Sequence, residues 1–297
     1  MGWMLSAALL QAAGFLAAAP LLKAAIKKMK ATLQNRQGPP LLQGYYDLAK
    51  LLRKDPLRSE TATWVYMAGP RVYLAAAVAA TTLVPVLVAG APLETAGGIL
   101  LLVGTLALGR FALATAALDT GSPFGGMGAS RDMTIAALAG GSLNLGGLVR
   151  NVLQHGAAFL PSDLLAFAGL FIIVIAETGR IPVDNPATHL ELTMIHEAMV
   201  LEYAGPDLAL VEWASAVKEL LYLTLLADLF FPWGIATSIA PGPIAIALIA
   251  WALKVFLLAT AVTLVESTNA KLRLFRVPEL VSMSLGLGFL ALAIRFL

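Results

Sequence analysis

The ionisable side chains of this chain gather in one stretch, from Glu177 to Asp228, which contains nine of its 18 acidic residues and two of its three histidines. Carboxylates and imidazoles can pass protons, because imidazole titrates near neutrality and burial shifts the pKa of a carboxyl group upward. In a membrane protein such groups are costly, and they usually mark an ion pathway or a partner site. We therefore predict that this stretch is the functional centre of the protein.

The acids and imidazoles that lie between apolar runs form a first group of candidates for a proton or ion pathway. They are Glu177, Asp184, His189, Glu191, His196, Glu197 and Glu202. If residues 187–203 are helical, His189 and His196 share one face of that helix, and Glu191 and Glu202 share another. Residues lined up on these faces could pass protons between water and the acidic residues of the membrane spans. A surface helix with solvated charges explains the same pattern, and the spacing favours neither explanation.

A second group of candidates lies inside the apolar runs or at their ends. It consists of Lys218, Glu219, Asp228 and Lys254, with Glu266 at the end of a further run. A lone lysine at the bilayer centre costs at least about 2.5 kcal/mol, so Lys254 should face protein or water and have an acidic partner. An ion pair that locks two helices is one explanation of these charges, but the position of Glu219 and Asp228 on the same chain of acids favours a pathway. Arg110, in another apolar run, could pair with these acids or with Asp132.

Motifs for other chemistries fail. His196 and Glu197 begin a match to the zinc-protease motif H-E-x-x-H, but Val200 replaces the second histidine. The glycine-rich segment 125–128 has no Lys-Ser/Thr after it, so a flexible turn explains it better than a phosphate loop does. The sequence has no cysteine, which excludes disulfides, cysteine-bound iron–sulfur clusters and Cys-type zinc sites on this chain. We assign it no catalytic residue and no metal ligand.

The elements that must position these side chains are long apolar helices. Hydrophobic residues make up 59% of the chain and charged residues 13%, about half of the charged fraction of a soluble domain. Apolar runs of roughly twenty residues recur, which indicates an all-α, polytopic membrane protein. The eight runs that we expect to cross the membrane, within one transmembrane domain over residues 1–297, are 3–26, 65–88, 97–118, 133–153, 164–176, 212–232, 244–265 and 277–297.

Basic residues divide unevenly between the loops. The loops after the first, third, fifth and seventh runs contain thirteen Lys and Arg residues, and the alternate loops contain none. The positive-inside rule then puts the first set in the cytoplasm and both termini outside. In the first cytoplasmic loop, apolar residues recur at helical spacing from Leu41 to Leu52, which predicts a short amphipathic helix at the membrane interface.

Several segments resemble motifs of one known family, which comprises subunit 1 (H) of respiratory complex I and its membrane-bound hydrogenase relatives. The first cytoplasmic loop of that family resembles N-R-Q-G-P-P-L-L-Q-G-Y-Y-D-L-A-K-L-L-R-K-D, which begins at Asn35. Its E-x-x-R-x-P-F-D…E-x-E-L…E-Y-S-G signature resembles E-T-G-R-I-P-V-D-N-P-A-T-H-L-E-L, which begins at Glu177, and the later L-E-Y-A-G. Two further segments resemble the formate hydrogenlyase and hydrogenase-4 members: L-D-T-G-S-P-F-G-G-M-G-A-S-R-D from Leu118 and E-S-T-N-A-K-L-R-L-F-R from Glu266.

The resemblance implies a slanted bundle of eight helices that anchors a soluble redox arm to a prokaryotic cytoplasmic membrane. It also implies that this chain carries no redox centre, so that iron–sulfur clusters, and a nickel–iron site or a quinone, belong with partner subunits. Those partners would be a hydrogenase-like large subunit, an iron–sulfur small subunit and antiporter-like membrane subunits, with the lipid bilayer around them and no nucleic acid. The residues expected at the interface with the redox arm are Arg36, Gly38, Pro39, Asp47, Lys50, Asp119, Arg131, Arg180 and Arg273.

The function that the resemblance implies is membrane anchoring and ion coupling in a redox-driven proton or sodium pump of the hydrogenase or formate hydrogenlyase type. Complex I members carry two further glutamates after the signature aspartate, where this chain has Ala187 and His189, which argues against a quinone chamber. The alternatives are the quinone-site subunit of an NADH:quinone oxidoreductase-like complex, a stand-alone proton-coupled secondary transporter and a purely structural anchor.

Overall fold

The regular elements of the structure, a computed structural model, are α-helices. It describes residues 2–57, 59, 61–84, 86, 98–142, 161–184, 194, 196–236, 240–272 and 276–296. The helices in these residues are α1 (Gly2–Leu33), α2 (Gln43–Leu52), α3 (Trp64–Thr81), α4 (Gly98–Asp119), α5 (Pro123–Ser142), α7 (Pro161–Glu177), α8 (His196–Val200), α9 (Gly205–Phe230), α10 (Pro241–Thr268) and α11 (Val277–Phe296). The all-α class expected from the apolar runs is therefore confirmed for the described part of the chain.

Four of the described helices are long and apolar enough to cross a membrane by themselves. These segments are Ala8–Leu33, Leu101–Asp119, Gly242–Thr268 and Val277–Arg295. Each of the other predicted spans overlaps a described helix, but that these helices cross the membrane stays a prediction. The flexible turn predicted for residues 125–128 is wrong, because α5 begins at Pro123 and includes them. Asp132 is accommodated in the helix because it pairs with Arg110 of α4, with 3.5 Å between the nearest nitrogen and oxygen.

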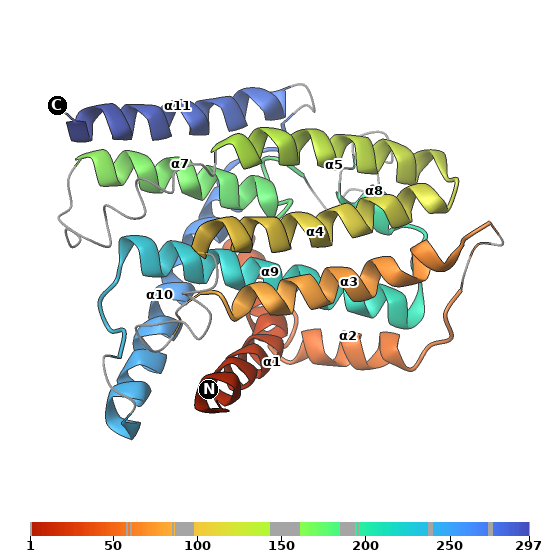
Figure 1. Ribbon diagram of the computed structural model, residues 1–297, viewed down its shortest axis with the longest axis horizontal. Coiled ribbons are helices and arrows are strands. Elements are labelled where there is room, and N and C mark those ends of the chain that lie inside the picture. Colours follow the sequence, from red (N-terminus) through yellow and green to blue (C-terminus); the bar gives the residue numbers. More distant parts are fainter. Residues whose placement is uncertain are drawn as a thin grey trace.

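Helix α9 is the core of the bundle. Leu220, Leu221, Leu223 and Leu226 are at most 1% exposed, and α9 is buried around most of its circumference, its charged residues Lys218, Glu219 and Asp228 included. Figure 1 shows α9 running among α3, α4 and α7, while α1 and α10 cross the others steeply. The two steep helices are attached to α9 by polar contacts.

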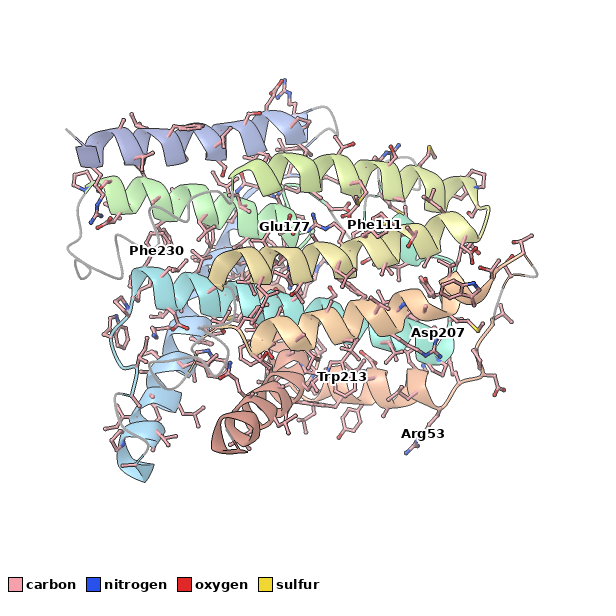
Figure 2. The ribbon with its side chains drawn as sticks, viewed as in Figure 1. Arg53, Phe111, Glu177, Asp207, Trp213 and Phe230 are labelled. Atoms are coloured by element: carbon pink, nitrogen blue, oxygen red, sulfur yellow. The ribbon has the colours of Figure 1, made fainter. Side chains whose placement is uncertain are left out.

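Two tryptophans make these contacts. The indole N–H of Trp213 in α9 donates to the carbonyl of Leu16 in α1, at 2.9 Å (Figure 2). The indole N–H of Trp251 in α10 donates to the hydroxyl of Thr224 in α9, at 3.0 Å. Because buried indole N–H groups need a hydrogen-bond partner, these contacts determine where α1 and α10 lie along α9.

Helix α2 lies in the segment where we predict an amphipathic helix, and its place at the membrane interface stays a prediction. None of its residues is buried, and it lies against α1 and α9. Gly44 brings its backbone close to α1, since a Cβ added there would lie 2.8 Å from the carbonyl oxygen of Pro20. The Tyr45 hydroxyl donates to the carbonyl of Ala17 in α1. These contacts hold α2 across the middle of α1.

Small residues allow α3 and α4 to pack closely. A Cβ added at Gly69 of α3 would lie 2.5 Å from the Cβ of Ala116, and one added at Gly109 of α4 would lie 2.9 Å from the Cβ of Ala76. Gly and Ala at helix contacts are typical of membrane helices, whose association depends on close van der Waals packing.

We expect Gly69→Ala to lower the free energy of unfolding by about 1–3 kcal/mol, because the added methyl group overpacks the α3–α4 contact. Gly104→Ala in α4 is the matched control, because nothing lies within 4 Å of the Cβ that it would add. That control should be neutral or stabilising, since Ala is favoured over Gly in helix interiors by about 0.5–1 kcal/mol. Thermal unfolding of the purified protein in mild detergent measures both, and equal midpoints would contradict the expected packing effect.

Candidate functional site

The turn at the end of α7 separates two residues of opposite charge, Glu177 and Arg180. The N–H groups of Gly179 and Arg180 donate to the carbonyls of Ala176 and Ile175, at 3.2 and 3.1 Å. Gly179 has a φ of +60°, so this is the Schellman motif that commonly ends helices. The turn directs the side chains of Glu177, in the last turn of the helix, and Arg180, just beyond it, into two separate ionic clusters.

The first cluster surrounds Glu177, whose side chain is 4% exposed. Its carboxylate pairs with Arg110 of α4 and with Lys218 of α9, the latter at 3.3 Å, and accepts a hydrogen bond of 3.0 Å from the Tyr222 hydroxyl. Arg110 also pairs with Asp132 of α5. Figure 2 shows Glu177 near the middle of the bundle, level with the central part of α9. This cluster joins α4, α5, α7 and α9 through charges.

The second cluster surrounds Arg180. Its guanidinium pairs with Glu219 of α9 at 2.5 Å and with Glu266 of α10 at 3.2 Å. Lys30 of α1 pairs with the other oxygen of Glu266, also at 3.2 Å. Burial alone would lower the pKa of Arg180, but the carboxylates of Glu219 and Glu266 outweigh burial and keep that pKa above its ordinary value. This cluster joins α1, α9 and α10 to the segment after α7.

The two clusters are connected through neighbouring residues of opposite charge. Lys218 and Glu219 are consecutive in α9, and they pair with Glu177 and Arg180, which are three residues apart at the end of α7. The cation comes from α9 in one pair and from the α7 segment in the other. A change of charge in one cluster therefore acts on the other over a single peptide unit of α9.

A separate ion pair, outside the two clusters, lies in the segment that follows Arg180. Asp184, whose side chain is 3% exposed, pairs with Lys271 at 2.9 Å and accepts a hydrogen bond of 3.3 Å from the backbone N–H of His196. The backbone N–H of Leu272 donates to the carbonyl of Pro182 at 2.8 Å. These contacts bring the chain after α10 and the start of α8 onto the signature segment.

Lys254 has the acidic partner that its position in an apolar run required. It pairs with Asp228 of α9 at 3.3 Å, donates to the carbonyl of Phe231 at 3.1 Å, and lies 5.5 Å from the centre of the Trp233 ring. The second carboxyl oxygen of Asp228 is buried and has no hydrogen-bond partner among the described residues. Asp228 lies two turns and a half along α9 from Glu219, so this pair is a separate ionic site near the end of α9.

Other candidates from the sequence lie nearer to the surface. Burial raises the pKa of Glu197 above its ordinary value, although the neighbouring His196 opposes this effect. Glu202 has an exposed side chain, and only its backbone carbonyl is used internally, as the acceptor of a 2.6 Å hydrogen bond from the Tyr66 hydroxyl. The helix considered for residues 187–203 is described only as α8, and Glu202 lies in the turn after it. His189, Glu191 and Arg273 lie outside the described residues.

The candidates for the redox-arm interface divide into surface and internal residues. Arg36, Asp47 and Lys50 are exposed, and Gly38 and Pro39 are half-buried. Asp119 accepts hydrogen bonds from the backbone N–H groups of Thr63 and Tyr66, at 2.7 and 3.1 Å, and so binds the N-terminus of α3. Arg131 donates to the carbonyl of Met194 at 3.0 Å. Arg180, in contrast, has its charge inside the bundle.

Arg110 and Glu266 are among the charged residues of the apolar runs, and the expected pairing of Arg110 with an acid of this stretch or with Asp132 is confirmed. Sequence reasoning did not include Lys30, Tyr222 and Lys271, which bond to Glu266, Glu177 and Asp184. The signal that could have found them is the cost of a charge in an apolar segment, which requires a partner for every candidate. Among the described residues, no group of three or more His, Cys, Asp or Glu side chains could hold a metal ion.

A cavity with a volume of about 350 Å³ lies between α1, α2 and α9. Apolar side chains such as Leu48, Leu51 and Leu208 form part of its wall, and Lys23, which pairs with Glu212 at 2.5 Å, forms another part. Lys27, Gln43 and Asp47 add further polar groups, so the wall is apolar on one part and charged on another, which suits an amphipathic organic molecule.

Comparison with known proteins identifies relatives over nearly the whole chain. The sequence model of the NADH dehydrogenase family matches residues 5–295. Formate hydrogenlyase subunit 4 of Escherichia coli (strain K12) is 30% identical over 95% of this chain and 96% of its own length. Hydrogenase-4 component C of the same organism is 28% identical over 98% and 95% of the two chains.

Two more distant matches are consistent with the same family. A subunit of the NADH-quinone oxidoreductase of Koribacter versatilis (strain Ellin345) is 27% identical over 60% of this chain and 49% of its own length. One chain of the membrane-bound sulfane sulfur reductase, described as an archaeal respiratory membrane complex, superposes with a TM-score of 0.77. The superposition covers 98% of this chain and 100% of that one at 19% identity, so the two share a fold.

We expect Lys254→Met alone to destabilise the protein by about 3–5 kcal/mol, because it leaves the charge of Asp228 buried without its partner. The double variant Lys254→Met/Asp228→Leu should regain most of that loss, since neither charge is left. Lys23→Met is the control, because the Lys23–Glu212 pair is more exposed and should cost only about 0–1 kcal/mol. Thermal unfolding in detergent measures all three, and a double variant no more stable than the single one would contradict the pairing.

Proposed function

Because this chain belongs to the NADH dehydrogenase family, we propose that it is the membrane subunit that couples a soluble redox arm to ion movement in neighbouring membrane subunits. The observation that carries the proposal is the pair of ionic clusters linked through Lys218 and Glu219. The names of the two Escherichia coli relatives favour a complex of the formate hydrogenlyase or hydrogenase-4 class. A complex of this kind moves H⁺ or Na⁺.

The proposed mechanism is electrostatic. Each cluster has two cations and two carboxylates, Arg110 and Lys218 with Glu177 and Asp132, and Arg180 and Lys30 with Glu219 and Glu266. Two unit charges about 4 Å apart interact by about 4 kcal/mol at an effective dielectric constant of about 20. A proton added to one carboxylate removes an attraction of this size to its paired cation, and the proposed mechanism passes this change of charge along α9.

The direction of transfer follows from the order of the charged groups along α9. Redox turnover changes the charge around Glu177 and Asp184, and this change passes through Lys218 to Glu219. The Asp228–Lys254 pair is the last charged site on this chain before the neighbouring subunits. The unpartnered oxygen of Asp228 supports this role, because a buried carboxyl group with an open acceptor can gain or lose a proton without breaking its other contacts. We include His189, Glu191, His196, Glu197 and Glu202 as the link to the cytoplasmic side.

The proposal includes a placement in the membrane. Eight helices (α1, α3, α4, α5, α7, α9, α10 and α11) cross the bilayer of a prokaryotic cytoplasmic membrane as one unit, and α2 lies at the interface. Both termini are outside, as the basic loops indicate. The redox arm, with a hydrogenase-like large subunit and an iron–sulfur small subunit that carry the metal centres, covers the loop with Arg36 and Lys50 and the cytoplasmic ends near Asp119, Arg131 and Arg273. Antiporter-like subunits pack on the membrane side.

One observation favours a second function within the same family. The cavity between α1, α2 and α9 lies where a quinone-reducing relative would need an apolar tunnel, and its volume of about 350 Å³ suits a ring with an apolar tail. A subunit that binds a quinone there would pass electrons to it from the partner's iron–sulfur cluster. The replacement of two family glutamates by Ala187 and His189 argues against this second function.

We expect Glu219→Gln to lower the number of protons moved per electron while the complex still assembles, because the amide keeps a hydrogen bond to Arg180 but cannot take up a proton. Glu219→Asp should retain more of the coupling, and Glu279→Gln, a change at an exposed glutamate, should retain all of it. Proton uptake in proteoliposomes that contain the whole complex, divided by electron flux, is the measurement. An unchanged ratio in Glu219→Gln would contradict the proposed pathway and support a purely structural anchor.

Purification of the tagged native protein in mild detergent, with mass spectrometry and metal analysis, tests the assignment to a complex. Iron–sulfur subunits together with nickel are expected for a hydrogenase-type complex. Iron–sulfur subunits without nickel, together with extractable quinone, would favour the second function. A stable chain that purifies alone and transports a solute in proteoliposomes would instead support a secondary transporter and overturn the proposal.

A further inference from the structure

A small cavity lies between the Glu177 cluster and the Asp184–Lys271 pair. Its volume is about 20 Å³, and a single water molecule needs about 10–15 Å³. The polar side chains in its wall are those of Tyr73, Asp132, Glu177, Thr178, Asp184, His196, Ser215 and Lys218. They come from α3, α5, α7, α8, α9 and the turn after α7, so the cavity lies where these elements meet. A site this small and this polar suits water better than any organic ligand.

Two polar side chains in this wall lack a hydrogen-bond partner among the residues that the structure describes. The Tyr73 hydroxyl and the His196 imidazole make no side-chain hydrogen bond to another described residue. Tyr73 is only 4% exposed, and its ring lies 6.4 Å from that of His196. A buried hydroxyl without a partner costs about 1–3 kcal/mol, so such groups are normally hydrogen-bonded to protein or to ordered water. The cavity beside both groups is the place for that partner.

The charges around the cavity favour a neutral occupant. Its three carboxylates each have their own cation: Asp132 pairs with Arg110 at 3.5 Å, Glu177 with Lys218 at 3.3 Å, and Asp184 with Lys271 at 2.9 Å. A sodium ion would therefore enter a site without net negative charge and next to the ammonium group of Lys218. Water, which both donates and accepts hydrogen bonds, suits the mixture of groups better.

We propose that this cavity is a water site that connects the Asp184–Lys271 pair with the Glu177–Lys218 pair, and that His196 and Tyr73 hold the water there. The inference rests on the proposed coupling function and adds the site at which protons enter the pathway. His196 is half-buried, whereas the Glu177 side chain is deeper, so the water lies between the cytoplasmic side and the first cluster. Imidazole and water can relay a proton between the cytoplasmic side and the Glu177 cluster, because each gives up one proton as it takes up another.

The first test is an experimental map of the intact complex, at a resolution that shows ordered water, for the wild type and two variants. Density for one water is expected in the wild type and in His196→Gln, whose amide can still hydrogen-bond. It should be lost in His196→Phe combined with Tyr73→Phe, which keeps an aromatic ring at each position and removes both polar groups. No density in the wild type, or a peak that requires sodium in the buffer, would overturn the proposal.

The second test measures protons moved per electron in proteoliposomes that contain the same complexes. We expect this ratio to fall at least about tenfold in His196→Phe, given that a positioned proton-transfer group typically contributes about 10²–10⁴-fold to the rate of proton transfer. His196→Gln should keep the water and still show the loss, because an amide does not carry a proton. Tyr46→Phe, at an exposed tyrosine, is the control and should be unchanged.

The outcomes separate this inference from the function on which it rests. If Glu219→Gln lowers the ratio and His196→Phe does not, the water site is not part of the pathway and the inference fails while the coupling function stands. If neither variant lowers the ratio, the coupling function itself fails. If both lower it and the density is present, both are supported.

Discussion

Two salt bridges of opposite polarity, Glu177–Lys218 and Arg180–Glu219, hold the end of α7 against the middle of α9. Breaking a buried pair by removing one partner costs about 3–5 kcal/mol, so each of these groups must keep a counter-charge in the folded protein. The remaining partners come from other elements: Arg110 from α4, Asp132 from α5, and Lys30 and Glu266 from α1 and α10. Six helices are thus positioned by the need to neutralise four charges on two segments.

The apolar packing keeps this charged centre rigid. Leu220, Leu221 and Leu223 bury the faces of α9 next to Lys218 and Glu219, and glycines let α3 and α4 approach closely beside it. A rigid frame suits the proposed function, because charge can then move by proton transfer and small side-chain shifts instead of helix movement. The same ion pairs would hold the helices together in a purely structural anchor, which is why stability and coupling need separate measurements.

Glu177 lies between two cavities of different character. On one side is the water-sized polar cavity with His196 and Tyr73, and on the other an apolar cavity of about 130 Å³ between α4, α5, α7 and α9, in which Arg110, Glu177 and Tyr222 are the polar groups. A proton that reaches Glu177 therefore meets hydrocarbon on the α4 side. Within the proposed function, α9 offers the polar continuation, through Lys218 and then Glu219.

The sequence by itself determined the helical class and the approximate positions of the described helices, because apolar runs and their period are local properties. It also indicated that Lys254 needs an acidic partner. Only the tertiary structure decided which partner each charge has: Arg110, Lys30 and Lys271 are 67, 236 and 87 residues from their acids. The sequence predicted a flexible turn at residues 125–128, whereas the structure includes them in α5, because contacts of that helix with distant segments, such as the Asp132–Arg110 pair, are not visible in local sequence.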